Sequence, residues 1–219
     1  MFKKIFFTLL ILAVLTFGGL SVYVSTIDWN LHKNKIAQQF EEISGKKIVF
    51  EGPVSLSFFP SPYLSAKDIK IYNKTGENTT QPLASIQEMV TDLALVPLIK
   101  GNFVIKNMSL IKADILVEFM KNGKLNWYSE ISDIQRDKLD TVEVSLNSVL
   151  LEDASAHIIN DGLGIDVNLQ NLNAEITAES LFGPYRIDGN FVKDNNPAGF
   201  ALNLGTLSEN FATSLNLSP

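Results

Sequence analysis

The stretch GPVSLSFFPSPYLSAKDIKIYN, residues 52–73, is the most informative part of this 219-residue chain for its fold class. Its apolar and polar residues alternate with the two-residue period of a strand that has one buried face and one wet face. Pro60 and Pro62 interrupt the alternation. Because proline lacks an amide hydrogen and has a fixed φ, we expect these two residues to form a corner between two strands. The alternative is an edge strand that prolines interrupt to prevent aggregation.

The apolar positions of this stretch change parity along the chain. Leu64 and Ala66 fall on one face of the predicted strand, whereas Ile69 and Ile71 fall on the other. A sheet with a single apolar face must therefore accommodate an extra residue at positions 67–68, as a bulge does. Bulges curl sheets, so this pattern predicts curvature.

Alternating runs continue to the end of the chain and are separated by turn sequences such as NKTGEN, KNGK and NDG. The segment 86–95 fits both a helix and a strand, and we favour a strand up to about Val96, followed by a tight turn at 97–101. We therefore predict a mainly β protein: a curled, elongated antiparallel sheet with an open, groove-like architecture.

The N-terminus reads as a membrane segment. Residues 5–24 carry no charge, and about 20 residues are what a helix needs to cross a bilayer. Lys3 and Lys4 precede this segment, which predicts a cytoplasmic N-terminus and an exported body. The alternative is a cleaved signal peptide, for which Gly19 and Ser21 would provide a weak cleavage site.

A short amphipathic helix is predicted over 28–44. Asp28 or Asn30 can cap its start, and Gly45 can end it in the left-handed conformation. Its apolar face consists of Ile36, Phe40 and Ile43.

These features predict an order of segments along the chain. The segments are a cytoplasmic tip (1–4), a transmembrane helix (5–24), the amphipathic helix (28–44), a first β block (46–128), a polar linker (129–140) and a second β block (141–219). We expect the second block to be incomplete, because the chain stops within an alternating run.

Composition argues against several classes of function. The formal net charge is -6 and basic residues form no run, so nucleic acid is not an expected partner. The chain has no cysteine and two histidines; we interpret His32 as a surface residue and His157 as a strand residue with its hydrogen bonds satisfied. No nucleophile elbow, paired-histidine zinc motif, phosphate loop or calcium loop is present in the sequence. We therefore expect no enzymatic activity, no metal and no cofactor.

The order of several motifs resembles the N-terminal region of AsmA-type proteins. The resemblance rests on GKKIVFEGPVSLSFFPSPYLSAKDIKIYN and on LASIQEMVTDLALVPLIKGNFVIKNMSLIKADILVEFMKNGKLNW. The family-like elements are Gly52, Pro60 with Pro62, Asp68 with Ile69, the turn 97–101, and Asn122, Gly123, Asn126 and Trp127. Family members are commonly much longer, so the resemblance suggests a fragment or a truncated gene product.

The resemblance implies a single-pass protein of the bacterial inner membrane with a periplasmic body. It would carry phospholipid between the inner and outer membranes and support outer-membrane biogenesis. Its partners would be phospholipid acyl chains, the inner membrane, and outer-membrane or other envelope proteins. The alternative is a membrane-tethered scaffold or assembly factor that binds envelope proteins and has no lipid groove.

One short helix cannot cover the apolar faces of so many strands, so the sheet must either fold on itself or leave an apolar groove. Acyl chains in such a groove would gain roughly 0.8 kcal/mol per buried methylene. We expect the apolar side of the helix to close the end of the groove nearest the membrane. The groove candidates are Val54, Leu56, Phe58, Ile115, Val117 and Phe119.

Overall fold

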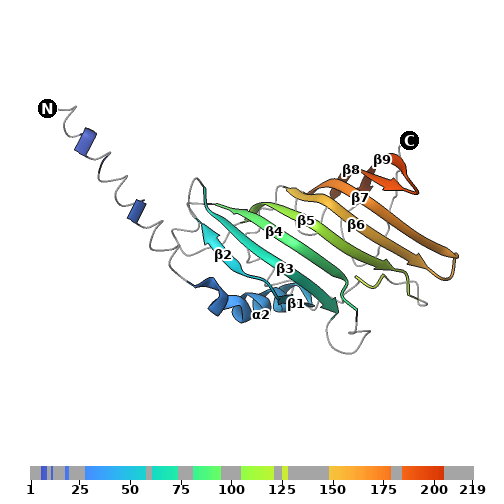
Figure 1. Cartoon of the computed structure of the whole chain (residues 1–219), viewed down its shortest axis with the longest axis horizontal. Helices are drawn as coiled ribbons and strands as arrows, with labels where there is room; N and C mark the ends of the chain where they lie inside the picture. Colours follow the sequence, from blue (N-terminus) through green and yellow to red (C-terminus); the bar gives the residue numbers. More distant parts are fainter. Residues whose placement is uncertain are drawn as a thin grey trace.

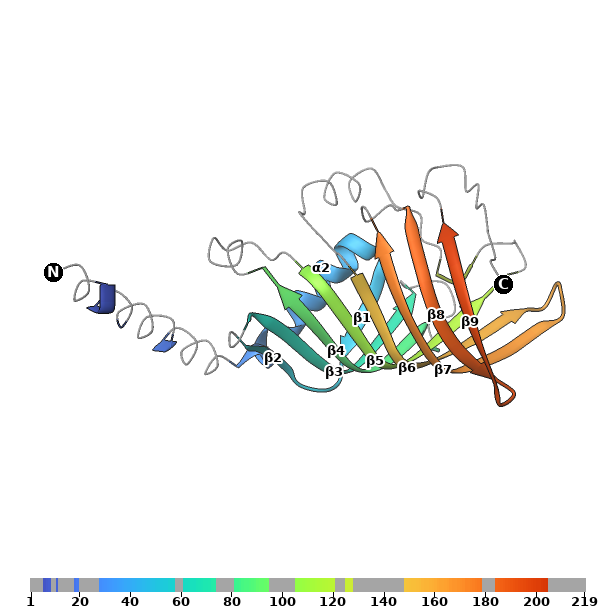
Figure 2. The same ribbon diagram turned by 90° about the horizontal axis from the view of Figure 1, so that it is seen from above.

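A curled sheet dominates the computed structural model, which describes residues 6–8, 11, 18–19, 28–57, 61–73, 81–94, 105–120, 125–127, 148–178 and 184–204 (Figures 1 and 2). One helix lies beside it, and the prediction of a mainly β fold is confirmed. The strands are β1 (Lys46–Phe50), β2 (Val54–Ser57), β3 (Tyr63–Asn73), β4 (Ala84–Leu93), β5 (Ile105–Glu118), β6 (Ser148–Asn160), β7 (Ile165–Ala178), β8 (Tyr185–Lys193) and β9 (Asn196–Leu204).

The predicted helix is present with a tightened first turn. Residues Trp29–His32 form the 3-10 helix η1, and Lys33–Ser44 form the α-helix α2. The Asp28 carboxylate caps η1 by accepting a hydrogen bond from the Asn30 amide. Gly45, with a φ of 67°, ends α2 in the left-handed conformation that its sequence position predicts.

The strand order is β1-β3-β4-β5-β6-β7-β8-β9, and β2 pairs with β3 beyond the end of β1. Neighbouring strands are antiparallel except β5 and β6, which are parallel in register from Asn107–Ser148 to Glu118–Ile159. The prediction of an antiparallel sheet is wrong at this pair. The chain between the two strands returns to the end of the sheet where β5 begins, as any parallel pair requires.

The quoted stretch forms the hairpin of β2 and β3. Ser57 faces Tyr63, so the turn between them contains both prolines. Pro62 is buried, and its carbonyl accepts a hydrogen bond of 2.9 Å from the Leu93 amide. Pro60 lies outside the described residues. The segment 86–95, which fits both a helix and a strand, is confirmed as a strand because most of it belongs to β4. The turn predicted at 97–101 and the linker predicted at 129–140 lie outside the described residues.

A row of left-handed residues crosses the sheet where the apolar parity changes. Asp68 on β3, Lys112 on β5, Asp153 on β6 and Asn171 on β7 have φ values of 49°, 50°, 51° and 48°. Each is followed by a buried apolar residue, so the same face stays apolar on both sides of the row. The change of face predicted near Asp68 is therefore present, and it is one of a series.

The core lies on the inner side of this curl. Its most buried members on the central strands are Ala66, Ile69 and Ala113, with exposed fractions of 0%, 1% and 1%. Figure 2 shows the sheet curled into a trough, with α2 on its inner side beside β1.

Most of the predicted transmembrane segment, 5–24, lies outside the described residues. Residues 6–8, 11 and 18–19 are helical, and the large side chains Phe6, Phe7 and Ile11 are exposed. Within the part of the chain that the structure describes, no helix has the length and apolar character needed to span a bilayer.

Candidate functional site

The inner face of the sheet is apolar from β1 to β9. Alternation directs every second side chain of each strand to this face, and the left-handed row restores the alternation where it would otherwise invert. The principal cluster of buried residues on this face comprises Ile48, Val54, Ala66, Ile69, Ala84, Ile86, Ala113, Leu151, Ala154, Ala156, Leu172 and Ala174.

The helix covers the β1 end of the inner face. Ile36, Ala37 and Phe40 of α2 pack against the principal cluster, as does Trp29 of η1. The predicted groove-end residues Ile36 and Phe40 thus lie against the sheet. The side chain of Ile43 is not among those that the structure describes.

Burial of the inner face decreases towards β9. Within the described residues, no residue of β8 or β9 is fully buried. Ile187, Phe191 and Phe200 nevertheless pack against the principal cluster, and the two phenylalanine rings lie 5.9 Å apart. Gly189 faces Phe200 across the strand pair, and a Cβ on this glycine would approach the Phe200 ring to 2.8 Å. The inner face is therefore covered at β1 and partly open at β8 and β9.

Tyr185 begins the inner face of β8. Burial raises the pKa of its phenol above the ordinary value. The side chain therefore stays neutral on the apolar face under physiological conditions.

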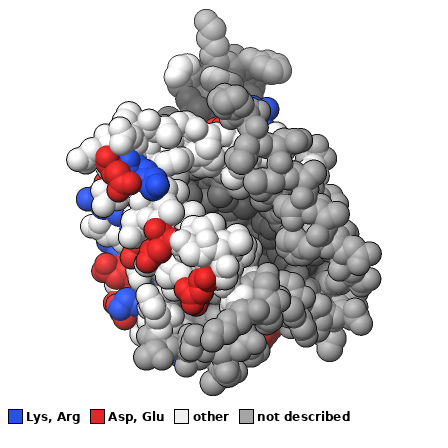
Figure 3. Space-filling model, turned by 90° about the vertical axis from the view of Figure 1, so that its right-hand side faces the viewer, with Lys and Arg blue, Asp and Glu red and all other residues white. Residues whose placement is uncertain are grey.

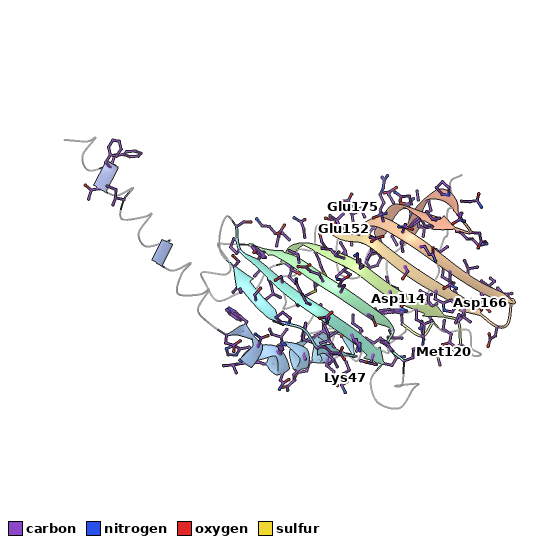
Figure 4. All side chains as sticks on the ribbon, viewed as in Figure 1. Lys47, Asp114, Met120, Glu152, Asp166 and Glu175 are labelled. Carbon is purple, nitrogen blue, oxygen red and sulfur yellow. The ribbon has the colours of Figure 1, made fainter. Side chains whose placement is uncertain are left out.

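Charged side chains lie mainly on the opposite, outer face. Figure 3 shows them gathered on the left-hand side of the described part, and Figure 4 labels Asp114, Glu152 and Glu175, which come from β5, β6 and β7. The Arg186 guanidinium hydrogen-bonds Asp188 at 2.6 Å and lowers the pKa of that carboxyl. Exposed ion pairs of this kind contribute little to stability, so the outer face is best understood as the solvated side.

The predicted groove residues lie on one face but in two places. Val54 and Leu56 of β2 are buried beside η1, where the Asn30 side chain accepts a hydrogen bond from the Val54 amide at 3.0 Å. Ile115 and Val117 lie on β5 on the far side of the left-handed row, both half-buried. Phe119 follows them and is 38% exposed. Phe58 lies outside the described residues.

Asn126 and Trp127 have a structural role that their positions in the sequence did not predict. The buried Asn126 side chain accepts from the Glu118 amide and donates to the Leu116 carbonyl, both at 3.0 Å. The Trp127 indole donates to the same carbonyl at 2.6 Å and packs against the principal cluster. In the sequence, only their place as the Asn-Trp pair that ends the family-like motif pointed to such a role. These residues hold the returning chain beside the end of β5.

The apolar inner face can accommodate hydrocarbon through contact alone. In the described part of the chain, no three histidine, cysteine, aspartate or glutamate side chains gather to hold a metal ion. His157 pairs with Asp166 at 2.8 Å on the outer face, away from the apolar side.

Comparison with known proteins identifies the family of the chain. The model of the AsmA family matches residues 2–214. The chain is also similar to Protein AsmA of Escherichia coli (strain K12), with 26% identity over 108 residues. That alignment spans 49% of this chain and 17% of the relative's length, and no solved structure matches. Because the family model spans nearly the whole sequence, the chain belongs to the AsmA family.

Proposed function

We propose that this protein is a membrane-anchored, non-enzymatic periplasmic protein of the bacterial envelope that carries phospholipid between the inner and outer membranes. In this proposal the acyl chains lie on the inner face of the curled sheet. The protein thereby supports outer-membrane biogenesis.

One observation carries the proposal: a single, mainly apolar face extends over the sheet while the charged side chains lie mainly on the other face. The buried Lys46, which donates to Asn73, lies at the β1 edge of the apolar face. Hydrocarbon needs no directional partners, only a surface from which water is excluded. The partly exposed Ile187, Phe191 and Phe200 give an acyl chain a place to lie where the core is not already closed by protein.

The anchor in this proposal is the segment 5–24. Its described residues are helical and expose Phe6, Phe7 and Ile11 by 64%, 59% and 58%, which is unfavourable in water and favourable in lipid. Lys3 and Lys4 would hold the N-terminus on the cytoplasmic side, so that the sheet lies in the periplasm.

A tethered scaffold without a lipid groove is the second candidate. It is favoured by the close packing at the centre of the inner face, where Ala66, Ile69 and Ala113 are 0–1% exposed. Under this alternative the inner face is a solid core, and the protein acts by binding other envelope proteins.

Site-specific photo-crosslinking in cells separates the two candidates. Probes replace Val117 and Phe191 on the inner face, and matched control probes replace their neighbours Glu118 and Asn190 on the outer face. We expect phospholipid adducts at the inner positions and none at the outer positions. Equal labelling of both faces, or no lipid adduct at any position, would contradict lipid carriage.

A further inference from the structure

Two buried polar atoms near η1 have no hydrogen-bond partner in the described structure. They are the indole Nε1 of Trp29 and the hydroxyl Oγ1 of Thr91 on β4. Thr91 is 1% exposed. Buried polar groups are almost always paired, because an unpaired group loses its hydration without compensation. Such a pair of atoms therefore indicates a missing partner, either a water molecule or a ligand.

Both atoms border one small apolar cluster. Trp29 packs against Leu56 and Leu93, together with Leu64 and Ile105. Thr91 faces Leu64 across the β3–β4 pair, and Leu64 in turn faces Leu56 across the β2–β3 pair. Thr91 also lies two residues before Leu93 on the same strand, and hence on the same face. The two polar atoms thus belong to the same end of the inner face.

We propose that Trp29 Nε1 and Thr91 Oγ1 form a subsite that binds the carbonyl oxygen of an acyl chain. This inference rests on the proposed lipid-carrying function and adds a point of polar recognition to it. An indole N–H can only donate, and a hydroxyl can donate as well, so their common ligand is an acceptor. The side chains of Leu56, Leu64, Leu93 and Ile105 pack there and supply no charge that would compensate a buried phosphate. A carbonyl oxygen attached to hydrocarbon satisfies both requirements.

Access to the subsite is through η1. Trp29 is only partly buried, and among the described residues one hydrogen bond ties η1 to the sheet, from the Val54 amide to Asn30 Oδ1. Leu31, in the same turn, is 80% exposed. An outward movement of η1 would break this hydrogen bond and part of the packing of Trp29 against the apolar clusters, and it would admit the carbonyl end of a chain between η1 and the sheet.

The test compares lipids with and without the acyl carbonyl oxygen. Purified full-length protein is titrated with an ester-linked phospholipid, with its ether-linked analogue, which lacks the carbonyls, and with the matching fatty acid. We expect the ester-linked lipid to bind at least about fivefold more tightly than the ether-linked lipid, the effect of one hydrogen bond. Because the ionised carboxylate of the fatty acid would be buried without compensation, we expect the fatty acid to bind more weakly than the ester-linked lipid, and tighter binding of the fatty acid would overturn the assignment to a neutral carbonyl.

Variants locate the effect. Thr91→Val, which keeps the shape of the side chain, and Trp29→Phe should each weaken ester-lipid binding about fivefold and leave ether-lipid binding unchanged. Thr91→Ser retains the hydroxyl and should retain the ester preference. Thr177→Val on the half-buried outer side of β7 is the matched control and should change neither affinity.

The outcomes distinguish this inference from the proposed function. Equal binding of ester and ether lipids by the natural protein would overturn the subsite and leave lipid carriage intact. An ester preference that persists in both Thr91→Val and Trp29→Phe would also overturn the subsite. Failure to bind any of the lipids would overturn both proposals.

Discussion

Gly52 lies in the connection between β1 and β2, which runs alongside β3. Its amide donates to the Lys67 carbonyl at 3.1 Å, beside the left-handed Asp68. A Cβ at position 52 would lie 2.6 Å from the same carbonyl oxygen and 2.8 Å from the Asp68 carboxylate. The first member of the left-handed row can therefore form only because its neighbour has no side chain.

We expect Gly52→Ala to lower the free energy of unfolding by about 1–3 kcal/mol, because the backbone must shift to relieve the overlap. Chemical denaturation measures this change. Gly199→Ala is the control, since its new Cβ would come no closer than 3.7 Å to the Gly189 carbonyl oxygen. Equal stability of the two variants would show that the close approach at Gly52 is not needed.

The pair of Arg186 and Asp188 gives a prediction about ionisation. The hydrogen bond from Arg186 lowers the pKa of Asp188, so Arg186→Gln should raise that pKa towards its ordinary value. A carboxyl whose pKa is lower in the folded chain stabilises the fold above its unfolded pKa, and this contribution is lost as the pH falls through the folded pKa. NMR titration of the Asp188 carboxyl measures the shift. Lys193→Gln, which alters a neighbouring pair with Asp194, should leave it unchanged.

At the scale of elements, the left-handed row explains how long strands keep one apolar face. The strand β4 makes the same change of parity between Ile86 and Met89 without a left-handed residue, so such a residue is one way to keep the apolar face and not a requirement. In β6 and β7 the register shifts fall beside Asp153 and Asn171. The side-chain amide of Asn171 donates a hydrogen bond to the Asp153 carboxylate at 3.2 Å. Aspartate and asparagine tolerate the left-handed region, and Lys112 is the unusual member.

Lys112→Gly should therefore stabilise the protein by up to about 1 kcal/mol, because glycine adopts a φ of 50° without steric cost. Lys106→Gly, at an exposed position on the same strand that lacks a positive φ, should instead destabilise it by about 0.5–1 kcal/mol. Thermal and denaturant unfolding of both variants gives the signs. A loss of stability in Lys112→Gly equal to that in Lys106→Gly would refute the role of the row.

At the scale of the whole molecule, the sheet is closed at one end and partly open at the other. The helix and η1 cover the inner face at β1 and β2, and the central strands hold the most buried residues. Towards β8 and β9 the inner side chains are only half-buried in the described part. This gradient is the property that a lipid carrier needs, with a stable base and an accessible surface.

Hydrogen exchange should report the same gradient. We expect backbone amides of β3–β5 to exchange more slowly than those of β8 and β9, because local opening is easier where fewer apolar contacts are lost. Mass spectrometry of peptides from the intact protein measures this order. Added phospholipid should slow exchange in β8 and β9 selectively; uniform protection in the lipid-free protein would contradict an open end.

Local patterns in the sequence were sufficient to predict the strands, the helix and its end at Gly45, and the change of face near Asp68. These features depend on neighbouring residues: a two-residue period, a cap, and a position that tolerates a left-handed φ. Three members of the left-handed row occur in the same local pattern: an apolar residue, two polar residues and an apolar residue. The three sequences are AKDI on β3, LEDA on β6 and LQNL on β7, and the third residue of each has the positive φ.

Only the tertiary structure determined which strands are neighbours and which side chains meet. Alternation marks the apolar face of a strand but contains no information about the direction of its partner, so the parallel pairing of β5 with β6 could not be derived from it. Alternation also does not show which strands are neighbours, so it could not predict that the groove candidates on β2 and those on β5 lie in two different parts of the inner face. Trp29 and Thr91 lie beside the same apolar cluster because β2 pairs with β3 and β3 pairs with β4 in particular registers. Packing of the whole inner face sets these registers, and no local pattern in the sequence does.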